Sequence, residues 1–314
     1  MFFSILGSSV KSIASLPVWT LKLHNRMSNC GRPLAAVCQL NSTPDKKANL
    51  CAAKELLEEA AQRGASVAFL PEAFDYIGSC QEETLALSES LEGHTMTQYC
   101  QMARKLNIWL SLGGFHERGP AWDVDQRTYN SHVVINNKGQ IVSIYRKSHL
   151  FDVELPEKGV SMKESAFTIP GPTLVSPVQT PVGKVGLGVC YDLRFPELSL
   201  ALQKNGAEIL TFPSAFTEFT GPAHWEVLLR ARAIENQCYV LAAAQVGRHH
   251  DSRSSYGHTL AVDPWGVVMG DCGGEKAGML LVEVDLDKMS SIRTNMPLQK
   301  HRRDENFYTK FSDD

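Results

Sequence analysis

Short apolar runs alternate with amphipathic segments along most of the chain. A short apolar run bounded by turn residues is typical of a buried strand, and apolar residues three to four positions apart predict a helix. Strands are predicted over residues 34–40, 67–70, 108–115, 129–135, 141–145, 184–189, 209–212, 239–243, 258–262 and 267–270. Helices are predicted over residues 46–63, 96–106, 197–203 and 225–236. This alternation favours the α/β class.

Turn residues predict how two pairs of strands are connected. The segment 136–139 reads Asn-Asn-Lys-Gly and predicts a hairpin between 129–135 and 141–145. The segment 263–266 reads Asp-Pro-Trp-Gly and predicts another between 258–262 and 267–270. Hairpins mixed with strand–helix units indicate a mixed sheet with helices outside. Periodicity alone does not distinguish a three-layer doubly wound fold from a four-layer one.

Three of the predicted strands end in different ionisable groups. Glu72 follows 67–70, Lys147 follows 141–145, and Cys190 follows 184–189. Each has a structural alternative: a loop glutamate, a solvated lysine at a strand end and a packed cysteine. Strand ends in α/β proteins often meet at one site, and together these groups fit one mechanism. Glu72 would accept the thiol proton, Lys147 would supply positive charge, and Cys190 would attack a carbonyl carbon.

Cys190 lies where its apolar strand meets a charged turn. A structural cysteine favours the middle of an apolar run, because a free thiol packs as a small hydrophobe. The turn contains Tyr191, Asp192, Arg194 and Glu197. A nucleophilic thiol commonly has its pKa lowered from about 8.5 into the range of about 3.5 to 7.5. We therefore expect a lowered pKa at Cys190 and faster alkylation there than at the other cysteines.

These motifs resemble the nitrilase superfamily of carbon–nitrogen hydrolases. The matching segments are LPEAF at 70–74, YRKSHLFD at 145–152 and GVCYDLRFPE at 188–197, within a resemblance that runs from Leu34 to about Phe307. The resemblance implies a Glu72–Lys147–Cys190 triad and a fourth residue, Glu164, that holds Lys147 or the substrate amide. It also implies an α-β-β-α four-layer sandwich of the nitrilase type, which forms a homodimer or a higher homo-oligomer.

The resemblance further implies an amidase. The segments at 113–119, 146–150, 170–172 and 242–250 resemble a branch that acts on 2-oxo-acid amides. The expected small-molecule substrate is deaminated glutathione, cleaved to 2-oxoglutarate and cysteinylglycine through a thioester on the cysteine. An ω-amidase or an N-carbamoyl hydrolase of the same superfamily is the alternative. A non-catalytic scaffold is a third interpretation, and the intact triad argues against it.

The expected chemistry needs no metal and no organic cofactor. An amide carbonyl is a poor electrophile, so the site must stabilise an oxyanion. The Lys147 ammonium and the backbone N–H of Tyr191 are the candidate donors. Glu72 would return its proton to the leaving nitrogen and then activate water against the thioester.

Substrate recognition is expected to involve three further side chains. Arg194 is a candidate for binding a substrate carboxylate, with an ion pair to Glu197 or Asp192 as the alternative. His224 and Trp225 are candidates for the pocket mouth, with aromatic packing in a helix N-terminal turn as the alternative. The pair His249-His250 could bind a metal, but adjacent histidines on a strand point in different directions and a third ligand is missing. We interpret them as loop residues near the site that could contact the Cys-Gly end of a peptide-like substrate.

Composition limits the possible partners and compartments. The 314-residue chain has a formal charge of −3 and eight cysteines without CxxC spacing. These values give no reason to expect nucleic acid or a zinc site, and scattered cysteines suit a reducing compartment. We find no apolar run near the roughly 18 residues that cross a membrane. One domain over 34–307 with a C-terminal tail over 308–314 is expected.

Residues 1–33 differ from the rest of the chain. They are basic and contain serine, and the first acidic residue of the chain is Asp45. This composition is typical of a mitochondrial transit peptide, with a disordered tail as the alternative. Initiation at Met27 would remove most of the segment. We therefore expect residence in both the mitochondrion and the cytoplasm.

Overall fold

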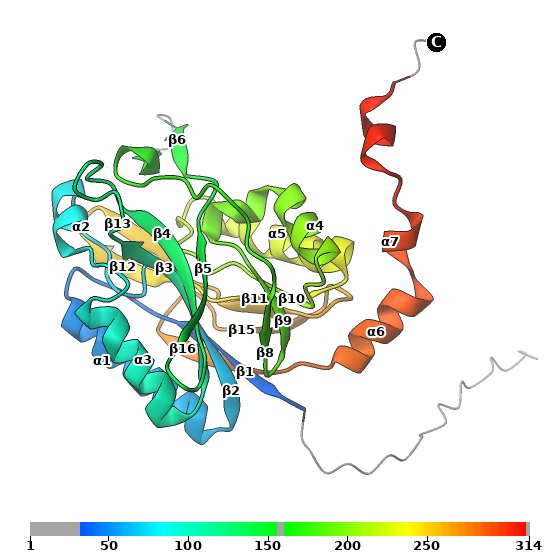
Figure 1. Cartoon of the computed structure of the whole chain (residues 1–314), viewed down its shortest axis with the longest axis horizontal. Coiled ribbons are helices and arrows are strands. Elements are labelled where there is room, and N and C mark those ends of the chain that lie inside the picture. Colours follow the sequence, from blue (N-terminus) through cyan, green and yellow to red (C-terminus); the bar gives the residue numbers. More distant parts are fainter. Residues whose placement is uncertain (1–31, 156–159, 312–314) are drawn as a thin grey trace, which may run out of the picture. The chain divides into compact units, whose positions relative to one another are not determined.

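The computed structural model describes residues 32–155 and 160–311 (Figure 1). The predicted transit peptide over 1–33 lies outside the described residues except for Arg32 and Pro33. Arg32 forms an ion pair of 2.7 Å with Asp285. At the other end, the short helix η4 (Glu305–Thr309) crosses the predicted boundary between the domain and a tail that begins at residue 308.

The first large sheet has the strand order β16-β1-β2-β3-β4-β5. Its strands are β1 (Leu34–Gln39), β2 (Ala65–Leu70), β3 (Trp109–Glu117), β4 (Tyr129–Ile135), β5 (Ile141–Arg146) and β16 (Gly278–Glu283). β1, β2 and β3 are parallel, and the other pairs are antiparallel. Both faces are buried: Ala35 and Val37 belong to one apolar cluster, and Ala36 and Cys38 belong to the other.

The second large sheet has the strand order β15-β14-β11-β10-β9-β8. Its strands are β8 (Val178–Thr180), β9 (Gly183–Leu187), β10 (Ile209–Thr211), β11 (Tyr239–Ala242), β14 (Leu260–Val262) and β15 (Val268–Asp271). Val185 and Val240 share one apolar cluster with Val37 and Phe69 of the first sheet. This cluster fills the space between the sheets.

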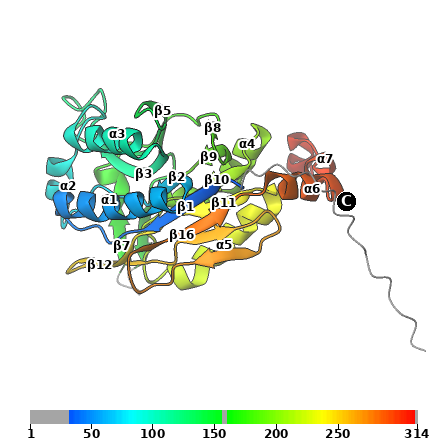
Figure 2. The same cartoon turned by 90° about the horizontal axis from the view of Figure 1, so that it is seen from below.

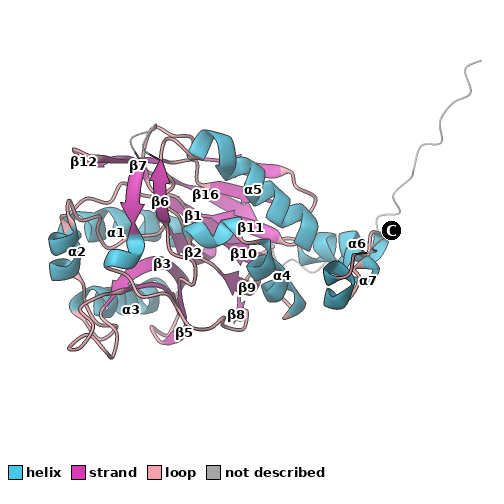
Figure 3. Cartoon of the chain, turned by 90° about the horizontal axis from the view of Figure 1, so that it is seen from above, coloured by secondary structure: helices cyan, strands magenta, loops and turns pink. Residues whose placement is uncertain are grey.

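Helices cover the outer faces of both sheets. The helices of the described chain are α1 (Lys46–Gln62), α2 (Gln81–Leu87), α3 (His94–Leu106), α4 (Pro196–Lys204), α5 (Gly221–Asn236), α6 (Leu286–Asn295) and α7 (Leu298–His301). Apolar side chains of α1 and α3 pack on the first sheet, and those of α4 and α5 pack on the second. Figure 1 shows the ribbons of these helices beside the strands. Figure 3 shows the strands enclosed between helices. The predicted α-β-β-α sandwich is therefore confirmed.

Most predicted elements are present, with ends that differ by a few residues. Both predicted hairpins form, as β4–β5 and β14–β15. The sequence patterns did not predict β8, β16, α2, α6 or α7, which lie at the edges of the two layers. Figure 2 shows α6 and α7 at the end opposite α2. No helix of the described chain is long and apolar enough to cross a membrane.

Two small hairpins were also missed, and they matter for the site. They are β6 (Asp152–Leu155) with β7 (Val160–Lys163), and β12 (Val246–His250) with β13 (Arg253–Tyr256). The interpretation of His249 and His250 as loop residues is therefore wrong, because both lie in β12. His249 is buried between Ser42 and Ser255, to which its ring nitrogens are bonded at 2.8 and 2.7 Å.

Candidate active site

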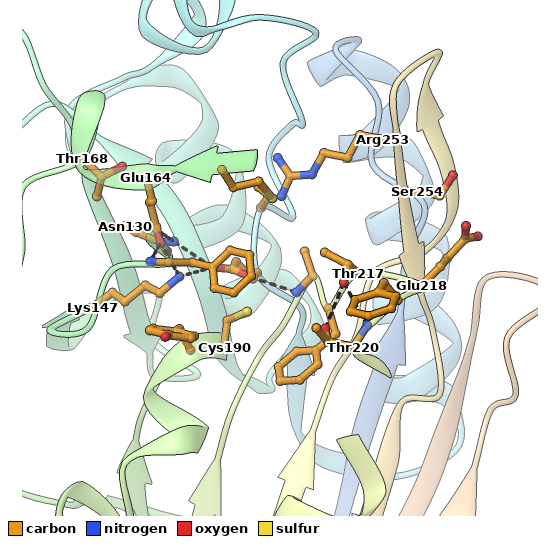
Figure 4. A pocket seen from close by; sticks show the side chains of 18 of the residues that line it. Asn130, Lys147, Glu164, Thr168, Cys190, Thr217, Glu218, Thr220, Arg253 and Ser254 are labelled. Carbon is orange, nitrogen blue, oxygen red and sulfur yellow. Dashed lines mark hydrogen bonds and ion pairs between the residues drawn. The ribbon is translucent and has the colours of Figure 1, made fainter. Parts of the chain in front are cut away.

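The three predicted triad residues line one cavity of about 470 Å³ (Figure 4). Glu72 follows the end of β2, Lys147 follows β5, and Cys190 opens the short helix η3 (Cys190–Arg194) after β9. β5 runs in the same direction as β2, because two antiparallel pairings separate it from β3. The ends of strands from both sheets therefore converge on one site. Its volume falls in the range of small-molecule pockets.

Glycines in β3 make room for the catalytic loops. A Cβ on Gly113 would lie 2.0 Å from the Pro213 side chain, and one on Gly114 would lie 2.7 Å from the Glu72 Cα. Such distances are far inside van der Waals contact, so any other residue would displace these loops. The loop after β2 is also fixed by Gln245, whose amide donates to the Glu72 carbonyl at 2.9 Å.

The backbone at Cys190 adopts an unusual conformation. Its φ is +45°, in the left-handed region that non-glycine residues seldom occupy. The Cys190 N–H donates to the Pro213 carbonyl at 2.9 Å, which helps to hold this turn. Strained backbone of this kind is typical of functional sites, where it aims a side chain that a relaxed turn would place elsewhere.

A closed network of charges surrounds Lys147, which is only 2% exposed. Its ammonium donates to Glu72 Oε1 at 3.0 Å and to the two Glu164 oxygens at 3.0 and 2.9 Å. Asn130 connects the same carboxylates, because its amide donates to Glu72 at 2.8 Å and to Glu164 at 3.2 Å. The remaining Glu72 oxygen accepts from the Ala215 N–H at 2.9 Å. Glu72 is thus held at both oxygens.

This network sets the charge states of its members. Burial alone would raise the pKa of Glu72, but the charge of Lys147 and hydrogen bonds from Cys190, Lys147 and Asn130 lower it overall. Burial alone would lower the pKa of Lys147, but the charges of Glu164 and Glu72 raise it well above its usual value. Glu72 is therefore a carboxylate and Lys147 an ammonium at neutral pH.

The expectation of a lowered thiol pKa at Cys190 is wrong. Burial and the negative charge of Glu72 raise the pKa of Cys190, and the opposing effect of Lys147 is smaller. The resting site therefore holds a protonated thiol in the same cavity as the Glu72 carboxylate. Such a pair can form the thiolate during attack, when Glu72 takes the proton as general base.

The residues predicted for recognition lie in two different places. Arg194 lines the cavity; its guanidinium lies 5.6 Å from the centre of the Tyr191 ring and donates to His224 Nδ1 at 3.1 Å. No ion pair joins it to Glu197 or Asp192 within the described residues, and Asp192 is buried against Tyr145 at 2.9 Å. Arg194 thus has no carboxylate partner among the described residues, and its binding of a substrate carboxylate stays a prediction.

Trp225 is not at the pocket mouth, which corrects the sequence prediction. Its side chain extends from α5 into the hydrophobic core, and its ring centre lies 4.8 Å from that of Phe216. Its indole N–H donates to the His258 carbonyl. Phe216 is the aromatic residue that lines the cavity. His224 does not line the cavity either and contacts Arg194 instead.

Among the cavity residues that sequence reasoning missed, three matter most for the chemistry. Asn130, Phe216 and Arg253 line the cavity and come from β4, from the loop after β10 and from the β12–β13 hairpin. Asn130 gave only a weak signal, because Ser131 and His132 next to it in β4 are also polar. The other two gave none, because the elements that carry them were not predicted as parts of the site.

Metal binding finds no support in the arrangement of side chains. Within residues 32–155 and 160–311, no three His, Cys, Asp or Glu side chains are grouped as ligands. The carboxylates of the cavity are instead paired with Lys147 and Asn130. Cys190, Glu72 and Lys147 together can perform nucleophilic attack, proton transfer and stabilisation of negative charge.

Comparison with known proteins gives a consistent picture. The profile of the carbon–nitrogen hydrolase family matches residues 34–294. The chain is 59% identical to the deaminated glutathione amidase of Homo sapiens over 276 residues, which are 88% of this chain and 84% of that protein. The corresponding protein of Bos taurus is 59% identical over 271 residues, which are 86% of this chain and 82% of that protein.

Solved structures show the same fold. The crystal structure of the C. elegans NitFhit protein has a TM-score of 0.82 and 48% identity, and the match covers 87% of this chain. It covers 65% of the NitFhit chain, so the present chain spans about two thirds of that protein. The structure of Saccharomyces cerevisiae Nit3, a member of the nitrilase superfamily, has a TM-score of 0.76 and 32% identity over 87% of this chain and 97% of that one.

Proposed function

Because the chain belongs to the carbon–nitrogen hydrolase family, we propose that it hydrolyses the amide bond of deaminated glutathione to 2-oxoglutarate and cysteinylglycine. The observation that supports this proposal most directly is the thiol of Cys190 beside the Glu72 carboxylate, with the Lys147 ammonium bonded to the same carboxylate at 3.0 Å. The relatives named for this activity are 59% identical over most of the chain.

The first half-reaction forms a thioester. As the Cys190 sulfur bonds to the amide carbon, its proton passes to Glu72 and the carbonyl oxygen becomes an oxyanion. The Tyr191 N–H and the Lys147 ammonium are the donors for this oxyanion. Lys147 makes two of its three contacts with Glu164, so a shift to a single Glu164 oxygen frees one N–H for the substrate. The C–N bond then breaks as Glu72 returns its proton to the leaving nitrogen.

The second half-reaction regenerates the enzyme. Glu72 is a carboxylate again after the amine leaves, and it takes a proton from water as the water attacks the thioester carbon. Collapse of this second oxyanion breaks the C–S bond, and Glu72 gives the proton back to the sulfur. Glu164 keeps at least one contact with Lys147, and Asn130 holds Glu72.

A panel of amides tests this proposal. The purified full-length chain is incubated with deaminated glutathione, 2-oxoglutaramate or an N-carbamoyl amino acid, and the acid and amine products are quantified by mass spectrometry. The expected result is the highest kcat/KM for deaminated glutathione, with equal amounts of 2-oxoglutarate and cysteinylglycine. A higher kcat/KM for 2-oxoglutaramate would replace the proposal with an ω-amidase. Preference for the carbamoyl compound would indicate an N-carbamoyl hydrolase.

We also propose that the chain forms a homodimer or a higher homo-oligomer and resides in both the mitochondrion and the cytoplasm. Light scattering measures the mass of the assembly, and a value of one chain would contradict the first part. A reporter fused to residues 1–33 should enter mitochondria, and a chain that begins at Met27 should stay cytosolic with unchanged activity. A cytosolic reporter would contradict the transit peptide without affecting the catalytic proposal.

A further inference from the structure

Arg253 presents an unpaired positive charge to the cavity. It begins β13, directly after the turn of the β12–β13 hairpin, and its half-buried side chain lines the same cavity as Cys190. Among residues 32–155 and 160–311, its guanidinium has no hydrogen-bond or ion-pair partner. Figure 4 shows Arg253 reaching from the hairpin over the cavity, on the opposite side from Cys190. An arginine fork without an anion is suited to a carboxylate ligand.

The acidic residues near Arg253 are turned elsewhere. Asp251 is two positions away, but its carboxylate accepts from Arg248 at 2.8 Å. Glu218 also lines the cavity, and Figure 4 shows its carboxylate pointing away from the Arg253 guanidinium. The charge of Arg253 is therefore not neutralised by these neighbours.

The charge of Arg253 helps to lower the pKa values of the two neighbouring histidines. Burial, and then the positive charge of Arg253, lower the pKa of His249 to about 4. The same two causes lower the pKa of His250. Both rings are neutral at physiological pH, so Arg253 is the cation that this hairpin offers to a ligand.

The two arginines of the cavity occupy different positions relative to the nucleophile. Arg194 is in η3, the short helix that Cys190 itself begins, whereas Arg253 comes from a separate hairpin across the cavity. A dipeptide leaving group has its own carboxylate, and two extended residues reach at most about 7 Å from the scissile nitrogen. A substrate with an acid at each end therefore requires two cations, one on each side of the scissile bond.

We propose that Arg253 binds the C-terminal carboxylate of the leaving amine, so that the enzyme selects amides whose leaving group is a peptide acid. This inference rests on the proposed function and assigns Arg194 to the carboxylate of the 2-oxo acid. The carboxylate pairs with the guanidinium both before and during the reaction. Loss of such a contact raises KM and leaves kcat nearly unchanged.

The test compares two substrates that differ only at the proposed contact. One is deaminated glutathione, and the other is the same molecule with its terminal carboxylate capped as a primary amide. In the wild-type enzyme, the charged substrate should have a kcat/KM about 10- to 100-fold above that of the capped one, as expected for a charge-assisted contact. In Arg253→Gln this ratio should fall by tenfold or more, mainly through KM for the charged substrate.

Two further variants control the interpretation. Arg253→Lys keeps the positive charge but loses the planar guanidinium. Its ratio of kcat/KM for the charged substrate to that for the capped substrate should lie between those of Arg253→Gln and the wild type. Arg63→Gln removes an exposed arginine at the end of α1, which pairs with Glu59, and should keep the wild-type ratio. Cleavage of both substrates with the same ratio in wild type and Arg253→Gln would overturn the Arg253 assignment alone. Failure of the wild-type enzyme to cleave deaminated glutathione would instead overturn the proposed function.

Discussion

Two groups of residues that line the cavity treat charge in opposite ways. The catalytic cluster of Glu72, Asn130, Lys147, Glu164 and Cys190 is closed, and each carboxylate contacts the lysine. The recognition wall, which is formed by Arg194, Phe216 and Arg253, leaves one guanidinium bonded only to a neutral imidazole and the other without a partner among the described residues. The cluster is prepared for proton transfer, whereas the wall is left open for a ligand.

This difference follows from the cost of burying charge. A buried carboxylate or ammonium must be paired, because desolvation is expensive. The cluster meets this requirement within the protein, so its geometry exists before substrate arrives. The arginines of the wall are partly exposed, and water can solvate them until a carboxylate displaces it. The first arrangement provides preorganisation, and the second provides affinity and selectivity.

Cys190→Ala should have the largest effect in the catalytic cluster. Without the sulfur no thioester can form, so kcat/KM should fall by about a thousandfold or more. The melting temperature should change little, because the substitution removes one small atom at the cavity surface. Product formation and thermal unfolding are measured on the same preparation. The exposed Cys51 provides the matched control, and Cys51→Ala should retain full activity. Residual activity of Cys190→Ala above one part in about a thousand would remove Cys190 from the nucleophile role.

Lys147→Met should have the next largest effect. Loss of a charged oxyanion donor typically costs about 100- to 1,000-fold in kcat. The exposed Lys105 offers a control, since Lys105→Met removes a charge far less buried than that of Lys147. An activity of the Lys147 variant within tenfold of wild type would place the oxyanion elsewhere.

The same variant should reverse the pH dependence of stability. In the wild type the pKa of Glu72 is lowered, so its stabilising contribution is present above its unfolded pKa and is lost as pH falls through the lowered value. Without Lys147, Glu72 and Glu164 are two buried carboxylates, and burial and repulsion should raise their pKa values. The variant should then gain stability as pH falls from 7 to 5. Melting curves across this range measure the effect, and parallel curves for both proteins would contradict it.

The catalytic cluster was largely predictable from the sequence, and the recognition wall was not. Glu72, Lys147 and Cys190 each follow an apolar run, and strand ends in α/β proteins meet at one edge. The wall depends on segments with weak patterns: β12 and β13 are short, and Phe216 lies in a loop. Trp225 and Phe216 are both aromatic residues near α5, and only packing shows which of them faces the cavity.

The error in the Cys190 pKa has a physical cause as well. The sequence shows the charged residues that follow Cys190 but does not show their orientation. Asp192 is turned into the core, Arg194 lies against aromatic rings, and the charge that affects the thiol pKa most is that of the Glu72 carboxylate. Burial adds to this effect. Local sequence therefore suggested an activated thiolate where the structure has a thiol with an adjacent base.

Asn130→Ala tests whether the cluster needs its neutral member. The Asn130 amide bonds to both carboxylates, and its hydrogen bond helps to lower the pKa of Glu72. Loss of a hydrogen bond to a charged group should reduce kcat by about tenfold or somewhat more, with little change in KM. The acid limb of the pH–rate profile should move to higher pH. Asn205→Ala, at the exposed end of α4, should change neither quantity. A change in KM alone would assign Asn130 to substrate binding.

His224→Ala should have the smallest effect and concerns the recognition wall. Burial and the charge of Arg194 lower the pKa of His224, so the neutral ring accepts one hydrogen bond from the guanidinium. Arg194 retains its contacts with the rings of Tyr191 and Phe216 when this bond is lost. KM for deaminated glutathione should therefore rise by only about threefold, at the lower end for a solvent-accessible hydrogen bond, with kcat unchanged. His224→Asn keeps an acceptor on the side chain and should restore much of the affinity. A tenfold loss of kcat in His224→Ala would show that the catalytic cluster and the recognition wall are coupled and that Arg194 also positions the reacting carbonyl.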